Sequence, residues 1–259
     1  MISSIDRIAL SGVDDNGLWQ SRTERLLGTD ALSRLHSARV LVMGIGGVGS
    51  WAAEALVRSS VGHITIVDAD RIVPSNINRQ LMATTKTVGE LKVEALRQRL
   101  LEINPAADVV AVNQEYNAEA AASLAIDSYD CVIDAIDSVA DKALLIYEAT
   151  RLKVPLFSSM GAALKSDPSR IRIGKFSEVK GCRLAAALRR RFKRSEQWPR
   201  RDFKCVYSDE LLPNLGSDEV RGTDGAMTYG KVSYNGSMCH ITAIFGMMLA
   251  GMAIRHISQ

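Results

Sequence analysis

The chain has 259 residues, of which 47% are hydrophobic and 24% charged, and its net charge is +3 at pH 7. This length and balance exclude a disordered or fibrous chain and predict one globular domain with a single large core. The four cysteines are scattered and the start does not read as a secretory leader, so we expect a protein of the reducing cytoplasm.

Apolar runs of strand length alternate with helical stretches along the chain, which predicts an α/β fold with a doubly wound, mostly parallel sheet of the Rossmann type. One or two helices are expected over residues 18–35. Strands are then expected over 40–43, 64–67, 109–112 and 132–136, from 154, and at 171–173, and helices over 48–60, 87–102, 118–124 and 141–151. The pattern does not indicate how residues 176–235 fold.

The first predicted strand leads into a glycine-rich turn and then into a helix. The glycines are Gly44, Gly46, Gly47 and Gly49. Such a turn forms a phosphate cradle, because glycines let backbone N–H groups approach the phosphates and the helix start carries partial positive charge. Asp68 ends the second strand, 24 residues after Gly44, where it can accept hydrogen bonds from a ribose. The sequence therefore predicts an adenine-nucleotide site.

Residues farther along the chain indicate which nucleotide binds, since a glycine fingerprint alone serves NAD, FAD and ATP alike. Two extra cations, Arg79 and Lys92, favour a longer and more negative phosphate tail than a dinucleotide has. Asp137 follows the strand predicted at 132–136, where it can hold the Mg²⁺ that accompanies ATP. Asp137 alone could equally cap the next helix, but together with the two cations it indicates an ATP site.

These motifs resemble the family of ATP-dependent adenylating enzymes related to ubiquitin activators. The likeness covers roughly residues 20–165, a nucleotide-binding core, and resumes near the C-terminus of a substrate-facing part at 166–259. It implies that Asp137 has a magnesium or catalytic role, with Ser138 beside it, and that Lys92 contacts phosphates. The remaining polar residues expected around the nucleotide are Asp70, Ser75, Asn76, Asn78 and Gln80, together with Arg79.

Within the family, the run from Gly44 to Leu56, the run from Val132 to Val139 and the segment 205–208 are similar to the tRNA-modifying dehydratases. The tryptophan after the glycines, Trp51, is a marked feature of that likeness. Other members carry two CxxC pairs for a structural zinc, which this chain lacks. The resemblance implies ATP-dependent activation of a carboxylate, as an acyl-adenylate, and cyclisation of threonylcarbamoyladenosine beside the anticodon of a tRNA with loss of water.

Two other functions stay open from sequence alone. One is an adenylyltransferase that activates the C-terminal glycine of a ubiquitin-like sulfur carrier. The other is an NAD-binding oxidoreductase or sensor, in which Arg79, Lys92 and Asp137 have no obvious role. The sequence also leaves open whether ATP yields AMP or ADP, whether a sulfur-acceptor or desulfurase-type partner takes part, and whether a monovalent ion binds.

A basic segment between residues 183 and 204 is the second candidate site. Its expected tRNA-binding residues are Arg189, Arg190, Arg191, Lys193, Arg194, Arg200 and Arg201. Three aromatic residues lie among them, Phe192, Trp198 and Phe203, a mixture suited to a phosphate backbone and stacked bases. The alternative is an ordinary solvated helix face followed by a crossover loop.

Relatives form two-fold dimers in which an arginine before the first strand reaches the partner's phosphates. We therefore expect a homodimer, with Arg22, or else Arg25, in that role.

The apolar run at 241–254 would rise about 21 Å as a helix, short of the roughly 30 Å of a bilayer's hydrocarbon core, so we expect a buried helix rather than membrane association. Cys205 and Cys239 are expected to be small buried hydrophobic residues rather than nucleophiles. The four histidines, at 36, 63, 240 and 256, show no metal-ligand spacing.

Overall fold

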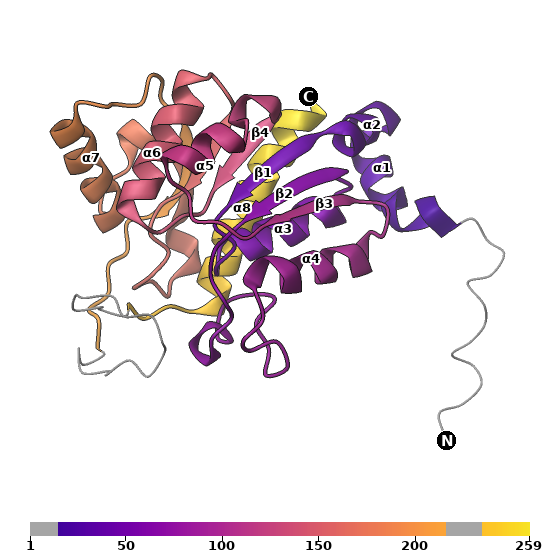
Figure 1. The fold of residues 1–259 in the computed structure, drawn as a ribbon, viewed down its shortest axis with the longest axis horizontal. Helices are drawn as coiled ribbons and strands as arrows, with labels where there is room; N and C mark the ends of the chain where they lie inside the picture. The colour runs from indigo at the N-terminus through magenta and orange to yellow at the C-terminus, as the bar shows by residue number, and fades with distance from the viewer. Residues whose placement is uncertain (1–14, 216–234) are drawn as a thin grey trace.

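The computed structural model describes residues 15–215 and 235–259, which form one sheet with helices on both faces (Figure 1). The sheet has the strand order β3-β2-β1-β4-β5-β7-β6. The strands are β1 (Arg39–Met43), β2 (His63–Val67), β3 (Asp108–Val112), β4 (Cys131–Asp134), β5 (Leu156–Ser159), β6 (Ile171–Lys175) and β7 (Lys204–Ser208). Neighbouring strands are parallel except for the edge pair of β6 and β7. The predicted doubly wound α/β fold is confirmed.

Eight α-helices accompany the sheet within the described residues. They are α1 (Ser21–Leu27), α2 (Thr29–Ser37), α3 (Gly49–Arg58), α4 (Lys92–Ile103), α5 (Ala118–Ser123), α6 (Val139–Arg151), α7 (Arg183–Ser195) and α8 (Cys239–Ser258). Short 3₁₀ turns lie at Asp15–Gln20, Pro74–Asn76, Ile126–Ser128, Pro168–Arg170 and Phe176–Glu178. Helices α3, α4 and α8 cover one face of the sheet, and α5, α6 and α7 cover the other.

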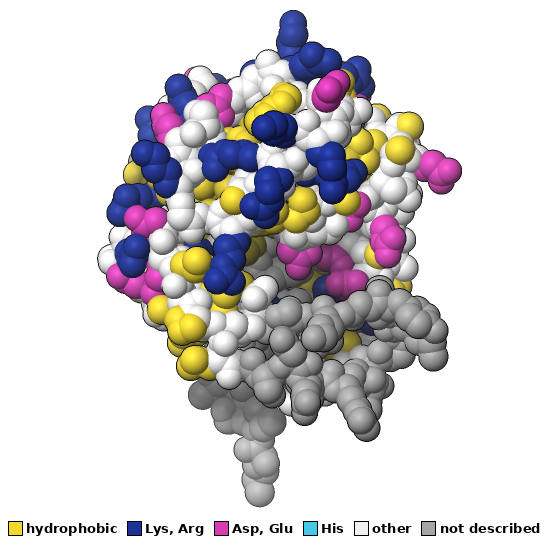
Figure 2. All heavy atoms as spheres, turned by 90° about the vertical axis from the view of Figure 1, so that its left-hand side faces the viewer, with side chains coloured by type: hydrophobic (Ala, Val, Ile, Leu, Met, Phe, Trp, Pro, Cys, Tyr) yellow, Lys and Arg dark blue, Asp and Glu magenta, His cyan; other side chains and the backbone are white. Residues whose placement is uncertain are grey.

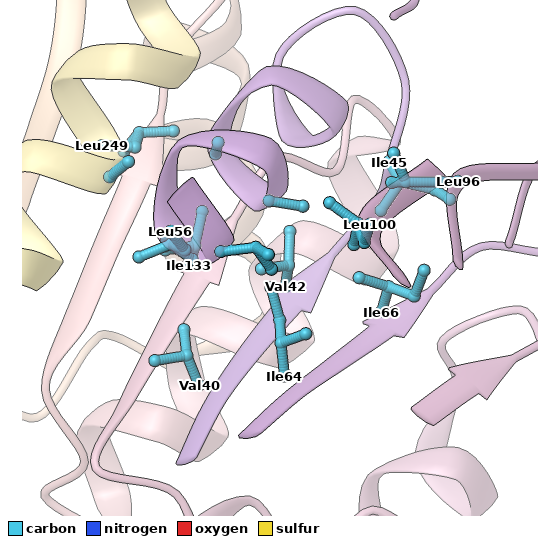
Figure 3. Packing of buried hydrophobic residues seen from close by; sticks show 14 of the residues in the cluster. Val40, Val42, Ile45, Leu56, Ile64, Ile66, Leu96, Leu100, Ile133 and Leu249 are labelled. Atoms are coloured by element: carbon cyan, nitrogen blue, oxygen red, sulfur yellow. The ribbon is translucent and has the colours of Figure 1, made fainter. Parts of the chain in front are cut away.

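The central strand β1 is buried on both faces. Val40 and Val42 point toward α3, where they pack near Leu56 (Figure 3), while Leu41 and Met43 point toward α5 and α6. Side chains alternate between the faces of a strand, so a strand covered by helices on both sides must be apolar at every position. This is why β1 was recognisable as a continuous apolar run.

Three elements near the candidate site differ from their predicted bounds, one of them α6, which begins at Val139 rather than at 141. Helix α4 begins at Lys92 rather than at 87, because a hydrogen-bonded turn from Thr84 to Thr87 and the positive φ of Gly89 (93°) precede it. Strand β4 ends at Asp134 rather than at 136, because the Asp134 carboxylate accepts a hydrogen bond from the Ile136 N–H and turns the chain. Lys92 therefore starts a helix, and the residues after Asp134 form a loop.

The segment without a predicted fold contains α7 and β7. Helix α7 packs against α6, and β7 inserts between β5 and the edge strand β6. Residues 216–234 of that segment lie outside the described residues.

Helix α8 packs on α3 and on the sheet, as predicted for the apolar C-terminal run, but it is longer than expected and spans 20 residues. At Gly246 it meets the start of α3 so closely that a Cβ would lie 2.4 Å from the Val48 carbonyl oxygen. By length and composition alone, α8 is long and apolar enough to cross a membrane, and 44% of its apolar window is buried within the structure.

Glu54 links α3 to α4, the two helices that begin at the candidate site. It is buried and forms ion pairs with Arg58 at 2.8 Å and with Arg99 of α4 at 2.5 Å. Burial acts to raise the pKa of Glu54, but the hydrogen bonds from Arg99 and Arg58 outweigh it and lower the pKa below its usual value.

Candidate functional site

The carboxyl ends of β1, β2 and β4 meet at one point of the sheet edge. Met43 pairs with Val67 on one side and with Asp134 on the other. The next residues along each strand therefore leave the sheet side by side, between β1 and β4, where the strand order reverses. Open parallel sheets bind their ligands at such a reversal.

The glycine turn is packed too tightly for side chains at its two ends. Gly44 has a positive φ of 78°, and a Cβ there would lie 2.9 Å from the Ala135 carbonyl oxygen. A Cβ at Gly49 would lie 1.8 Å from the Gly44 carbonyl oxygen. The turn therefore folds back on itself and rests on the loop that follows β4.

Asp68 is tied to the glycine turn. Its carboxylate accepts hydrogen bonds from the Ile45 N–H and the Asp70 N–H, both at 2.9 Å. Burial raises the pKa of Asp68, although the nearby Lys92 ammonium opposes the shift. The side chain that would contact a ribose is thus fixed to the turn that would hold phosphates.

Lys92 supplies a buried positive charge next to Asp68. Its Nζ lies 2.5 Å from Asp70 Oδ2 and 3.7 Å from Asp68 Oδ1, and the residue is only 5% exposed. A charge so enclosed needs an anionic partner, which these two carboxylates provide in the structure and a phosphate could also provide.

Arg79 lies over the glycine turn. A Cβ at Gly47 would lie 3.1 Å from Arg79 Cγ, and Arg79 Nη1 donates to Ser75 O and to Asn78 Oδ1, each at 2.9 Å. The Trp51 indole N–H donates to the Arg79 carbonyl oxygen at 3.1 Å. The tryptophan on α3 therefore holds the backbone that carries the arginine.

Gln80 brings an unsatisfied buried polar group to the same turn. Its side-chain oxygen has no hydrogen-bond partner among the described residues, and its Nε2 lies 3.8 Å from the Cβ position of Gly46. Asn76, also buried, caps this segment by accepting from the Val73 N–H. An unpaired buried amide oxygen is costly, so a donor from a nucleotide would satisfy it. The space at Gly46, where only Gln80 Nε2 lies within 4 Å of the Cβ position, and this oxygen fit a bound nucleotide.

Asp137 and Ser138 lie on the loop between β4 and α6. Both are exposed, and neither side chain forms a hydrogen bond or ion pair with the part of the chain that the structure describes. No group of three or more acidic, histidine or cysteine side chains in that part could hold a metal ion. Mg²⁺ commonly binds one or two carboxylates together with substrate phosphates and water, a pattern that Asp137 alone could serve.

Comparisons with known proteins show the family of the chain. Residues 20–259 match the ThiF family. The chain belongs to the ThiF family. It is 35% identical over 237 residues to the tRNA threonylcarbamoyladenosine dehydratase of Bacillus subtilis, covering 90% of this chain and 92% of that protein. With the Escherichia coli protein of the same name it shares 36% identity over 250 residues, 92% and 93% of the two chains.

A solved structure gives the same result for the fold of this ThiF-family chain. The E. coli dehydratase TcdA in complex with ATP superposes with a TM-score of 0.81 and 34% identity, covering 95% of this chain and 96% of that one.

Sequence analysis missed a buried charge pair behind the Asp137 loop of this ThiF-family chain. Lys142 on α6 lies 2.8 Å from Asp134, and neither side chain is exposed to solvent. Lys142 also donates to the Ile136 carbonyl oxygen at 3.0 Å, and Ser158 donates to Asp134 at 2.6 Å. The signal was an acidic residue inside an apolar strand, followed eight residues later by a lysine on the next helix.

The basic segment divides into two groups in the structure. Arg189, Arg200 and Arg201 form contacts within the chain: Arg189 donates to the Phe176 and Val179 carbonyl oxygens, Arg200 to the Tyr147 hydroxyl and Arg201 to the Val154 carbonyl oxygen. The other four, Arg190, Arg191, Lys193 and Arg194, form no hydrogen bond or ion pair with the described residues. Figure 2 shows this side of the molecule, where lysine and arginine side chains gather with hydrophobic atoms between them.

Two aromatic residues of that segment are not available for base stacking, contrary to the sequence-based expectation. Phe192 and Phe203 are buried, and both pack against Phe176. Trp198 is 49% exposed. The apolar face of α7 points Phe192 into the core, and Phe203, directly before β7, stacks on Phe176 there.

The remaining candidates are two arginines of α1 and the cysteines Cys205 and Cys239. Arg22 and Arg25 are exposed on α1 and form no hydrogen bond or ion pair within residues 15–215 and 235–259. Cys205 is buried as predicted, and burial raises the pKa of its thiol. Cys239 is exposed, so the prediction that it is buried was wrong: it is the first residue of α8, ahead of the buried part of the helix.

Proposed function

We propose that this chain is an ATP-dependent tRNA threonylcarbamoyladenosine dehydratase. The observation that carries the proposal is the position of three arginines that form no ion pair or hydrogen bond with the described residues. Arg190, Arg191 and Arg194 of α7 face Val139 and Ala140 across a groove, and Val139 is two residues from Asp137. An RNA backbone held by these arginines would reach the edge of the nucleotide site, as a tRNA substrate requires.

ATP would bind at the carboxyl edge of the sheet. The turn with Gly46 and Gly47 would cradle its phosphates, Asp68 would accept from the ribose, and Lys92 and Arg79 would stabilise the negative charge that gathers during the reaction. The other residues proposed to line the nucleotide are Gly44, Gly49, Asp70, Ser75, Asn76, Asn78, Gln80 and Ser138. Mg²⁺ would be held by Asp137 and would help neutralise the triphosphate.

The reaction has two steps. In the first, a threonyl carboxylate oxygen attacks the α-phosphorus of ATP, and the bond from this phosphorus to the oxygen bridging to the β-phosphate breaks. Pyrophosphate departs, and the product is an acyl-adenylate. The carbamoyl nitrogen then attacks the acyl carbon and loses its proton to solvent, and AMP leaves. The ring closes with net loss of water from the nucleoside, so the protein's main tasks are positioning and charge stabilisation.

The active form is a cytoplasmic homodimer in this proposal. Arg22 is exposed and forms no hydrogen bond or ion pair with the described residues, which suits a residue that reaches the phosphates of a second copy. A mixed dimer of an Arg22→Ala chain and a Lys92→Ala chain should keep one working site. Complete loss of activity in that mixture would contradict an arginine acting between subunits.

The decisive experiment is a product analysis. The purified protein is incubated with ATP and with tRNA that carries or lacks threonylcarbamoyladenosine, and the nucleosides and nucleotides are identified by mass spectrometry. We expect the cyclised nucleoside, AMP and pyrophosphate with the modified tRNA only. Pyrophosphate release that depends instead on a ubiquitin-like carrier protein would show that the chain is a carrier-activating adenylyltransferase.

The role of Asp137 is tested in the same assay. Asp137→Asn should lower turnover at least about 100-fold, the typical cost of one preorganised charge-stabilising group, without changing the thermal midpoint. Asp127→Asn, which alters an exposed acid on the 3₁₀ turn Ile126–Ser128, serves as the control. Turnover of Asp137→Asn equal to that of the control would remove Asp137 from the site.

A further inference from the structure

The groove between α6 and α7 has an apolar floor beneath a basic rim. Its volume is about 470 Å³, and its floor is formed by Val139, Ala140 and Ala187. The rim consists of Arg190, Arg191 and Arg194. This volume is within the ~300–1,000 Å³ of pockets that hold small organic groups.

The three rim arginines line the groove with positive charge. They form no hydrogen bond or ion pair with the described residues, unlike the neighbouring Arg189, which is held by two backbone carbonyl groups. Arg190 and Arg194 are four residues apart on one helix face, where like charges destabilise a helix. Their placement is understandable if an anionic ligand occupies the groove.

A second, more polar pocket continues the first. Asn117, Ser195 and Gln197 contribute amide and hydroxyl groups to it, Asp141 contributes a carboxylate, and Ala140 and Arg191 belong to both pockets. Amide and hydroxyl groups can hydrogen-bond the edges of unpaired bases, and a guanidinium plane can stack on a base.

We infer that the apolar pocket holds a nucleobase of the tRNA, that of a nucleotide flanking the modified adenosine. A single-stranded nucleotide combines a flat apolar face with a phosphate, which matches an apolar floor beneath arginines. Because the floor includes the first two residues of α6, the base would lie close to Asp137 and would place the next nucleotide at the ATP site. This inference rests on the proposed function, and it specifies how that substrate is held.

The test combines a filled pocket with a missing base. Ala187→Leu places a larger side chain on the floor, and Ala186→Leu, on the same helix but outside both pockets, is the matched control. Affinity is measured by fluorescence anisotropy for an anticodon stem-loop carrying the modified adenosine, either intact or with an abasic site 5′ or 3′ to it.

Wild-type protein should lose about tenfold in affinity when one of the two flanking bases is removed, since stacking of one base is typically worth roughly 5- to 140-fold in affinity. Ala187→Leu should bind the intact stem-loop about tenfold more weakly and lose nothing further with the abasic one, whereas Ala186→Leu should behave as wild type. An equal abasic penalty in Ala187→Leu and wild type, or no penalty in either, would overturn the inference.

A second variant guards against misfolding of the first. Ala140→Leu fills the same pocket from α6 and should give the same non-additive result. If both variants unfold, the abasic comparison on wild type alone still decides between a bound base and an unbound one. The proposed function is tested separately, because wild-type protein that forms the cyclised nucleoside but shows no abasic penalty retains the function and loses only this base site.

Discussion

Removing the positive charge of the buried Lys142 should destabilise the protein strongly. Lys142→Met leaves the Asp134 carboxylate fully buried without a counter-charge, which typically costs about 3–5 kcal/mol of unfolding free energy. Ser158 and the Ile136 N–H still donate to Asp134, so we expect the lower end of this range, about 3 kcal/mol. Urea denaturation, analysed with a shared m value, measures the change.

The double variant Asp134→Asn/Lys142→Met should be more stable than the single one. An asparagine at this position can still accept from the Ile136 N–H and can donate to Ser158, and no charge remains buried. Replacement of whole buried ion pairs is often neutral, so we expect the double variant to lie within about 1 kcal/mol of wild type. Arg151→Met, which breaks the exposed pair with Glu148, is the control and should have no measurable effect.

The same variants separate stability from positioning. Lys142 ties the Ile136 carbonyl group to α6, and the loop so held carries Asp137. We therefore expect the double variant to fold normally and to turn over more slowly. If Lys142→Met were as stable as Asp134→Asn/Lys142→Met, the reasoning would be refuted, because the unpaired buried charge would then not determine the loss of unfolding free energy.

Three further predictions follow from the contacts of the nucleotide site and its helices. Glu54→Gln should be less stable than wild type at a pH above the usual glutamate pKa. The difference in unfolding free energy should shrink as the pH falls through the lowered pKa of Glu54, because protonation of Glu54 removes the wild-type ion pairs. A pH series of unfolding free energies checks this. Trp51→Phe keeps the ring but loses the hydrogen bond to the Arg79 carbonyl group, so ATP binding by calorimetry should weaken by about 1 kcal/mol with little change in fold. Gly47→Ala should displace Arg79 and weaken ATP binding, whereas Gly251→Ala, with no atom within 4 Å of the new Cβ, should leave ATP binding unchanged and raise the thermal midpoint.

Much of the arrangement of the candidate nucleotide site could be predicted, because the positions of its residues follow from topology. Buried parallel strands are continuous apolar runs, and the residues after them meet at one edge of the sheet. Asp68 and Gly44 each follow such a run directly, so their proximity was predictable from the sequence. Asp137 was predictable in the same way, although the strand before it ends earlier than its apolar run.

The contacts that fix these residues could not be predicted, because they join residues distant in the sequence. Trp51 donates a hydrogen bond to the carbonyl group of Arg79, 28 residues away. Ser158 donates one to Asp134 on the neighbouring strand, 24 residues away. Neither pairing leaves a periodic signal. The fold of the basic segment was also hidden, since a charged composition does not distinguish an exposed helix from one with a buried aromatic face such as that of Phe192.

Helix α6 connects the parts of the proposed mechanism. The loop before it carries Asp137, its first two residues form the floor of the arginine-rimmed groove, and its fourth residue, Lys142, is anchored to the end of β4. A shift of this helix would therefore move the RNA groove and the Asp137 loop together relative to the glycine turn. If Lys142 sets the position of α6, the Asp134→Asn/Lys142→Met variant should weaken stem-loop binding and slow turnover in parallel. Loss of turnover with unchanged RNA affinity would instead confine the role of the ion pair to the loop.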